Sequence, residues 1–307
     1  MATPVSFAGV FPILATPFDE GGNLDLEAFE RLIRFMAQLG VDGVTILGVL
    51  GESNRLLDSE RETLIAAAVK AAAGHLPVIV GASHAGTRAT IGLCQMAHEL
   101  GADALMVTPP VDSASNEKLI VEYFERVAEA AKLPIVLQDH PASTQVNMPV
   151  ALLLRLVGQI QGIVCIKEEA TPTPARIAAL LKGMGQRQVP VLTGLGGLYG
   201  FFDLESGASG FNTGFAFPEV LLSIVSATRA GRLDEAFQLY TRFLPLIVFE
   251  QQPGVAIRKE LLRMRGLLRS NQVRHPGLAI TEATAAQVRR LLDRILPDTD
   301  ITQPIRC

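Results

Sequence analysis

Short apolar runs alternate with longer amphipathic segments along this chain of 307 residues, and this alternation limits its possible folds more than any other feature. The apolar runs, expected as strands, occupy residues 9–16, 43–47, 77–82, 103–110, 134–141, 162–167, 189–194 and 208–214. The segments expected as helices occupy residues 25–39, 58–74, 87–100, 116–131, 149–157, 173–182, 197–205 and 218–230. Strands that are apolar on both faces indicate a parallel sheet covered by helices.

Eight strand–helix units are the number that closes an α/β barrel, and such barrels typically take about 250 residues. The predicted fold is therefore a (β/α)8 TIM barrel over residues 1–230, which would carry any active site. Residues 231–307 lack strands and are predicted as a C-terminal appendage of three helices, over residues 232–250, 253–268 and 281–296. An open, doubly wound sheet is the alternative, but no strand is followed by the glycine-rich dinucleotide fingerprint.

Several classes of function are disfavoured by composition. The net charge is −4 and the basic residues are scattered, so a nucleic-acid partner is not expected. The N-terminal segment lacks the basic start of a signal peptide, and no apolar run reaches the roughly 18 residues of a membrane span. Three cysteines without metal-type spacing give no disulfide framework, so we expect a reducing, cytoplasmic setting.

The appendage is rich in basic side chains. We expect them to form a solvated or subunit-facing surface rather than a phosphate site, because charged runs usually face solvent. These residues are Arg258, Lys259, Arg263, Arg265 and Arg269.

A lysine ends the apolar run in "QGIVCIKEEA", residues 161–170. On this window alone, a solvated Lys-Glu-Glu cluster at the end of a strand is a sufficient explanation. The alternative is an amine nucleophile, because the pKa of a buried lysine falls readily. Strand alternation would place Ile163, Cys165 and Lys167 on one face and Val164 and Ile166 on the other.

The position of the lysine within the barrel favours the second interpretation. In barrel enzymes, catalytic side chains come from the C-terminal ends of the strands and the loops that follow. If Lys167 faces inward there, desolvation leaves its amine partly neutral and able to attack a ketone. Such positions are Thr16, Gly48 to Ser53, Ser83, His84, Thr108, Gln138 to His140, Lys167, Thr193, Gly194, Asn212 and Thr213.

Several motifs at strand ends resemble one known family. They are "GVFPILATPF" (9–18), "GVLGES" (48–53), a proline-bearing motif after the fifth strand, "IKEEA" and "TG" (193–194). In this order and spacing they resemble the dihydrodipicolinate synthase and N-acetylneuraminate lyase family of lysine-dependent, Schiff-base-forming lyases. The resemblance implies that Lys167 forms an imine with a 2-keto acid, without a metal or other cofactor. It also implies that the segment Gly48, Val49 and Leu50 cradles the carboxylate of that acid, although the family's usual hydroxyl side chains are absent here.

The chain departs from the synthase pattern at three places. Gln138 stands where the family has a proton-relaying tyrosine, and an amide cannot titrate. The tyrosine usually found after the fourth strand is missing, and Ser143 stands where the synthases have a carboxylate-binding arginine. "QDHPAS", "IKEE" and "RHPG" (274–277) look closer to the 2-keto-3-deoxy-L-arabonate dehydratase branch.

That resemblance implies a dehydratase for a 2-keto-3-deoxy sugar acid. His140 or Asp139 would supply the acid that dehydration needs, with His84 as a further candidate. Glu52 would brace its loop, and Ser53 would offer a hydroxyl or a structural hydrogen bond. The substrate contacts expected at the later strands are Thr193, Gly194, Asn212 and Thr213.

Other functions stay open at this point. A pyruvate-dependent aldolase on the same lysine, a deaminase of a cyclic imino acid, and a catalytically silent barrel that binds a keto acid are the alternatives. The family habit also implies a homo-oligomer, either a dimer or a tetramer, whose other partner is the small-molecule substrate.

Overall fold

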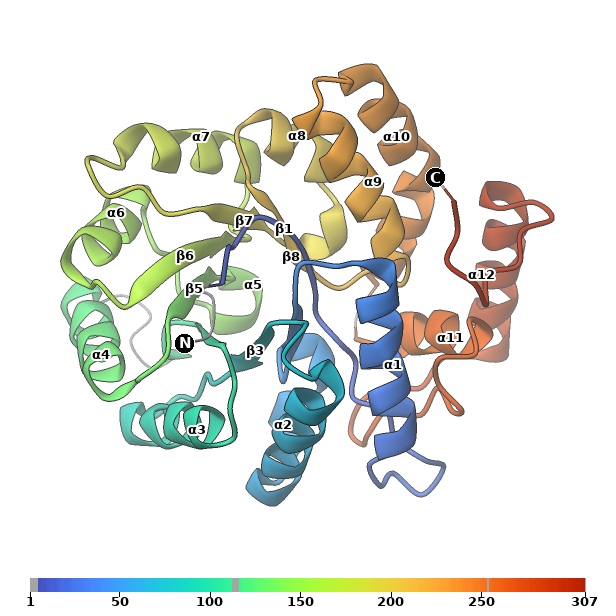
Figure 1. Ribbon diagram of the computed structural model, residues 1–307, viewed down its shortest axis with the longest axis horizontal. Coiled ribbons are helices and arrows are strands. Elements are labelled where there is room, and N and C mark those ends of the chain that lie inside the picture. The colour runs from blue at the N-terminus through green and yellow to red at the C-terminus, as the bar shows by residue number, and fades with distance from the viewer. Residues whose placement is uncertain (1–4, 112–115, 253, 307) are drawn as a thin grey trace.

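A computed structural model describes residues 5–111, 116–252 and 254–306. Eight parallel strands form its centre and are ringed by helices (Figure 1). The strands are β1 (Gly9–Pro12), β2 (Val44–Ile46), β3 (Val78–Gly81), β4 (Ala104–Val107), β5 (Ile135–Asp139), β6 (Ile163–Glu168), β7 (Val191–Thr193) and β8 (Gly210–Thr213).

From β2 to β8 each strand pairs in parallel with the next strand in the chain, and β1 pairs in parallel with β8. The remaining gap is bridged just beyond the end of β1, where Ile13 pairs with Thr45 of β2 and the Leu14 N–H donates to the Thr45 carbonyl at 2.9 Å. The sheet is therefore a nearly closed barrel, and the predicted (β/α)8 TIM barrel is confirmed.

The helices of the barrel wall follow the strands as the sequence pattern predicts. They are α1 (Leu26–Leu39), α2 (Asp58–Ala72), α3 (Thr87–Glu99), α4 (Glu117–Ala130), α6 (Val150–Gln159), α7 (Thr173–Gly183), α8 (Gly200–Glu205) and α9 (Pro218–Arg229). Short turns that periodicity did not predict lie in the loops after β2, β5 and β7: η1 (Val49–Gly51), η2 (Ser53–Arg55), α5 (Pro141–Thr144) and η4 (Leu195–Gly197). Strand β5 ends at Asp139 rather than at Pro141, because proline has no N–H for the ladder and instead starts α5.

The interior of the barrel is filled by apolar side chains from alternate strand positions. This cluster consists of Phe7, Phe11, Ile79, Ala104, Met106, Val136, Cys165 and Leu192, with Val164 packed against it. Ile163 packs instead with Ile166 in the larger cluster between strands and helices. The expectation that Ile163 shares a face with Cys165 was wrong, because the pairing of β5 with β6 shifts register there and an irregular residue reverses the alternation.

Three helices follow the barrel, coloured orange to red in Figure 1: α10 (Leu233–Glu250), α11 (Ala256–Met264) and α12 (Glu282–Ile295). Pro253, the first residue of the expected range 253–268, lies outside the described residues. Apolar residues of these helices share one buried cluster with α8, α9 and strands β1 and β8. No helix among the described residues is long and apolar enough to cross a membrane.

The basic residues of α11 and its C-terminal flank do not form the expected surface. Arg258, Lys259 and Arg265 are buried, with exposed fractions of 5%, 0% and 1%. They form ion pairs with Glu250, Glu52 and Glu219, respectively. A buried cation needs such a partner, and the carboxylates come from the barrel loops and from α9 and α10, so the basic residues turn inward. Only Arg263 and Arg269 keep much of their side chains exposed.

Candidate active site

Lys167 lies near the C-terminal end of β6 and points into the barrel mouth. It is 1% exposed, and its backbone lies opposite Gln138 of β5 and Leu192 of β7. Its Nζ is 3.0 Å from Oε2 of Glu169. This lysine is both paired with a carboxylate and shielded from water, and a buried lysine amine shifts its pKa readily.

Glu169 connects three elements around this amine. Its Oε2 also accepts from Gln138 Nε2 at 2.7 Å, and its Oε1 accepts from the Leu195 N–H at 3.0 Å. A Cβ on Gly194 would lie 2.0 Å from Oε1, so only glycine lets this carboxylate approach the loop after β7. Sequence reasoning did not select Glu169, although its place two residues beyond Lys167 was a signal for the same face.

Burial and mutual electrostatic interaction shift the pKa values of Lys167 and Glu169. Burial lowers the pKa of Lys167, and the Glu169 carboxylate opposes this shift. Burial alone would raise the pKa of Glu169, but Lys167, His140, Gln138 and the Leu195 N–H together hold it below its ordinary value. The site therefore combines an anionic carboxylate with an amine that deprotonates more readily than a solvated lysine.

A cavity of about 190 Å³ opens above the pair. It is lined by Lys167, Glu169, Gln138, His140, Val49, Leu50, Thr213 and Arg258, among others. His140 shares the cavity but donates to or accepts from Ser143 Oγ through its Nδ1, at 2.7 Å. Burial lowers the pKa of His140, with Glu169 opposing the shift and Lys167 adding to it, which favours a neutral imidazole.

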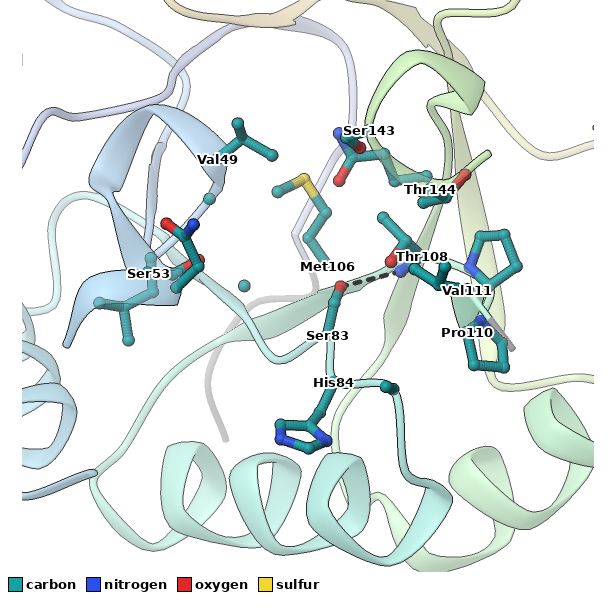
Figure 2. Close-up of a pocket in the computed structure, with 17 residues that line it drawn as sticks. Val49, Ser53, Ser83, His84, Met106, Thr108, Pro110, Val111, Ser143 and Thr144 are labelled. Atoms are coloured by element: carbon teal, nitrogen blue, oxygen red, sulfur yellow. Dashed lines mark hydrogen bonds between the residues drawn. The ribbon is translucent and has the colours of Figure 1, made fainter. Parts of the chain in front are cut away.

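A second cavity of about 320 Å³ adjoins the first, since Val49 and Gln138 line both. Figure 2 shows Val49 and Ser53 on one side of it and Ser143 and Thr144 on the other. Its lining is mostly apolar, with hydroxyl groups among it, and one of these, Ser83 Oγ, accepts from the Thr108 N–H at 3.0 Å. Together the cavities place the Lys167 amine beside a larger, mostly apolar pocket that carries a few polar groups.

The turn after β2 is braced by Glu52. This residue is 1% exposed and has a left-handed backbone, with φ of 54°. Its Oε1 lies 2.5 Å from Lys259 Nζ, and its Oε2 accepts from Arg55 at 2.8 Å and from the Arg274 N–H at 2.9 Å. These contacts hold the turn with Gly48, Val49 and Leu50 against the C-terminal helices. They are the contacts of a structural brace, and Glu52 lines neither cavity.

Four predicted substrate contacts also line neither cavity: Asp139, Thr193, Gly194 and Asn212. Asp139 faces α7, where Arg176 Nη2 donates to it at 2.7 Å. Burial and then Glu168 raise the pKa of Asp139 to about 7, against the effect of Arg176. Strand alternation accounts for this placement, because Asp139 follows the inward residue Gln138.

Gly194 lies against the Glu169 carboxylate, and the remaining two are occupied by structural hydrogen bonds. Thr193 Oγ1 donates to Asp203, and Asn212 Oδ1 accepts from Thr45 Oγ1 at 3.3 Å. Thr213 does reach the first cavity, and its Oγ1 accepts from the Gly196 N–H at 2.7 Å. His84 lines the second cavity, but its Nδ1 accepts from the Gly86 N–H at 3.0 Å, and Figure 2 shows its ring turned away from Val49 and Ser143.

The comparison with known families agrees with this geometry. The model of the dihydrodipicolinate synthetase family matches residues 6–295, nearly the whole chain. The chain belongs to this family. Its members are enzymes that include dehydratases and synthases.

Among its relatives in the family is the L-2-keto-3-deoxyarabonate dehydratase of Azospirillum brasilense, which is 33% identical over 294 residues and covers 94% of each chain. A 4-hydroxy-tetrahydrodipicolinate synthase of Ruegeria pomeroyi is 32% identical over 289 residues, covering 92% of this chain and 96% of that one. Among solved structures, a dihydrodipicolinate synthase from Rhodopseudomonas palustris superposes with a TM-score of 0.91 at 36% identity, covering 96% and 99% of the two chains.

Proposed function

We propose that this chain is a Schiff-base-forming dehydratase that acts on a 2-keto-3-deoxy sugar acid such as 2-keto-3-deoxy-L-arabonate. The observation that carries the proposal is the buried Lys167 amine, 3.0 Å from the Glu169 carboxylate at the base of a cavity. The dehydratase relative from Azospirillum brasilense supports the choice of substrate class.

The reaction begins at the amine. The Lys167 ammonium passes one proton to Glu169, and the neutral Nζ then adds to the C2 carbonyl to give a carbinolamine. The proton returns from Glu169 to the carbinolamine hydroxyl, which leaves as water, and the resulting iminium makes the C3 protons acidic. The Glu169 carboxylate is adjacent to Nζ and therefore stays paired with the positive charge when the iminium forms. This pairing stabilises the cation in the low-dielectric barrel mouth.

Elimination follows from the same arrangement. Glu169 takes a C3 proton, and the electron pair of the C–H bond forms the enamine. The enamine then expels the C4 hydroxyl, which leaves as water with a proton supplied by Glu169 or through His140. Gln138 donates to Glu169 at 2.7 Å and keeps that carboxylate in place without titrating itself. Rearrangement of the unsaturated product and hydrolysis then release the oxo acid and restore Lys167.

A pyruvate-releasing aldolase is the second candidate, because it would start from the same imine. Cleavage between C3 and C4 requires a base at the C4 hydroxyl, which is the task of the tyrosine in the family. Gln138 occupies that position and carries no titratable proton, which disfavours cleavage relative to elimination.

Borohydride trapping tests the imine. Reduction in the presence of a 2-keto-3-deoxy acid or pyruvate is expected to add the ligand's mass at Lys167. Lys259 provides an internal control, because it is also buried, with a pKa lowered to about 8, but lies outside both cavities. Modification of Lys259 instead, or full turnover with no trapped lysine, would refute the role of Lys167.

A further inference from the structure

Arg258 reaches the reactive cavity from outside the barrel. It lies in α11, which packs on the barrel, and it lines the cavity of about 190 Å³ together with Lys167 and Glu169. Its exposed fraction is only 5%, so this guanidinium is held within the protein. No element of the barrel itself contributes a second cation to the lining of this cavity among the described residues.

The guanidinium is only partly satisfied. Its Nε donates to Glu250 Oε2 at 2.8 Å, and Glu250 Oε1 accepts from the Ala216 N–H at 3.1 Å, which fixes the pair. Nη1 of Arg258 is buried and has no hydrogen-bond partner within the described part of the chain. Leaving such a donor unpaired is costly, especially on a charged group, so this position suits an acceptor that arrives with a ligand.

The free nitrogen lies beside the turn that follows β2. A Cβ on Gly214 would stand 2.2 Å from Nη1 and 2.4 Å from Leu50 Cδ1, so the guanidinium and the Leu50 tip lie close together over the same glycine. That turn is where we expect the carboxylate of the keto acid, but Val49 and Leu50 offer it no side-chain donor. Arg258 brings the missing donor to this place.

We propose that Arg258 binds the C1 carboxylate of the 2-keto acid through Nη1 and thereby determines specificity for acids over neutral carbonyl compounds. This inference rests on the proposed function and adds a binding residue supplied by the C-terminal helices. A 2-keto-3-deoxy sugar acid carries a single anionic group, next to the C2 carbon that Lys167 attacks. Arginine donors match carboxylate geometry, and a charge-assisted hydrogen bond in a buried site is stronger than a neutral one.

The test compares pyruvate with pyruvamide, which has the same shape but no charge. Titration calorimetry gives the two dissociation constants for the wild-type chain and for a variant that combines Arg258→Met with Glu250→Gln. The second substitution prevents an uncompensated carboxylate from unfolding the variant. Arg263→Met is the matched control, since this arginine lies in the same helix, is 41% exposed and lines neither cavity.

The wild-type chain and the Arg263→Met control are expected to bind pyruvate more tightly than pyruvamide. In the double variant the ratio of the two dissociation constants should move toward one by about 10- to 100-fold. Glu250→Gln alone should keep the preference, because the guanidinium then faces the ligand without a competing carboxylate. An unchanged preference in the double variant, or no measurable binding of pyruvate to the wild-type chain, would overturn the inference. Binding of pyruvate without trapping at Lys167 would instead refute the proposed function. The measured preference for pyruvate over pyruvamide would then still decide whether Arg258 binds the carboxylate.

Discussion

Replacing Glu169 with glutamine is expected to separate imine formation from elimination. The substitution keeps the shape of the side chain but removes the charge that lies 3.0 Å from Lys167 Nζ. It also replaces one acceptor oxygen by an NH2 group, so the amide of Gln138, which now donates to Glu169 Oε2, has to turn over for a hydrogen bond to persist beside the Leu195 contact. The variant therefore loses its proton-transfer group, and the network that positions it has to rearrange.

The two steps should respond very differently. Loss of a general acid or base typically costs about 10²- to 10⁴-fold in rate, so dehydration should fall by that factor. Removing the anion also lowers the pKa of Lys167 further, because Glu169 is the group that opposes the effect of burial. More of the amine is then neutral, and borohydride trapping of pyruvate should persist.

Glu168→Gln is the matched control, because this neighbouring glutamate is also buried but faces Arg176 behind the barrel. Steady-state dehydration is followed by the appearance of the oxo acid, and trapping is measured by mass spectrometry of the reduced protein. Dehydration in Glu169→Gln within tenfold of the wild-type rate, or an equal loss in Glu168→Gln, would refute the role assigned to Glu169.

Three further outcomes are expected. Trapping of pyruvate should accelerate with rising pH and reach half its maximum below pH 10.5, because burial lowers the pKa of Lys167; a midpoint at or above that value contradicts a desolvated amine. The pKa of Asp139 is raised from an ordinary 3.8 to about 7, which contributes stability at low pH that is lost as the pH rises through about 7. The Tm of Asp139→Asn relative to that of the wild-type chain should therefore increase between pH 3.8 and about 7. Lys259→Met removes one of the two cations that pair with the buried Glu52, the other being Arg55, and should cost up to about 3–5 kcal/mol in urea unfolding. Much of this loss should be recovered by adding Glu52→Gln, and equal losses in the single and double variants would contradict the brace.

The barrel was predictable because its signal is local and repeated. Parallel strands covered on both faces must be apolar throughout, and the helices between them carry a helical period, so each unit can be recognised alone. Lys167 could be identified for the same reason, since an ionisable residue ending such a strand stands out. The irregularity in β6 could not be read from the sequence, because it depends on the register of two strands, and it reversed the side of Ile163.

The rest of the site depends on tertiary contacts. Strand alternation could have placed Glu169 on the same face as Lys167. Its selection required knowing that the alternation continues past Glu168, the last residue of β6. Arg258 carried no local signal, because a basic helix normally faces solvent and its burial follows from carboxylates such as Glu250 in another helix. Asp139 follows the inward residue Gln138, so strand alternation turns it away from the cavity, but its ion pair with Arg176 of another element could not be predicted from the sequence.

The most direct test of the central claim is the ratio of products from one substrate. The wild-type chain is incubated with 2-keto-3-deoxy-L-arabonate, and oxo acid and pyruvate are quantified together by NMR. A dehydratase with Gln138 in the tyrosine position is expected to give far more oxo acid than pyruvate, and Gln138→Tyr should shift the ratio toward pyruvate. Efficient release of pyruvate by the wild-type chain, with negligible oxo acid, would contradict this expectation and show that the barrel is an aldolase.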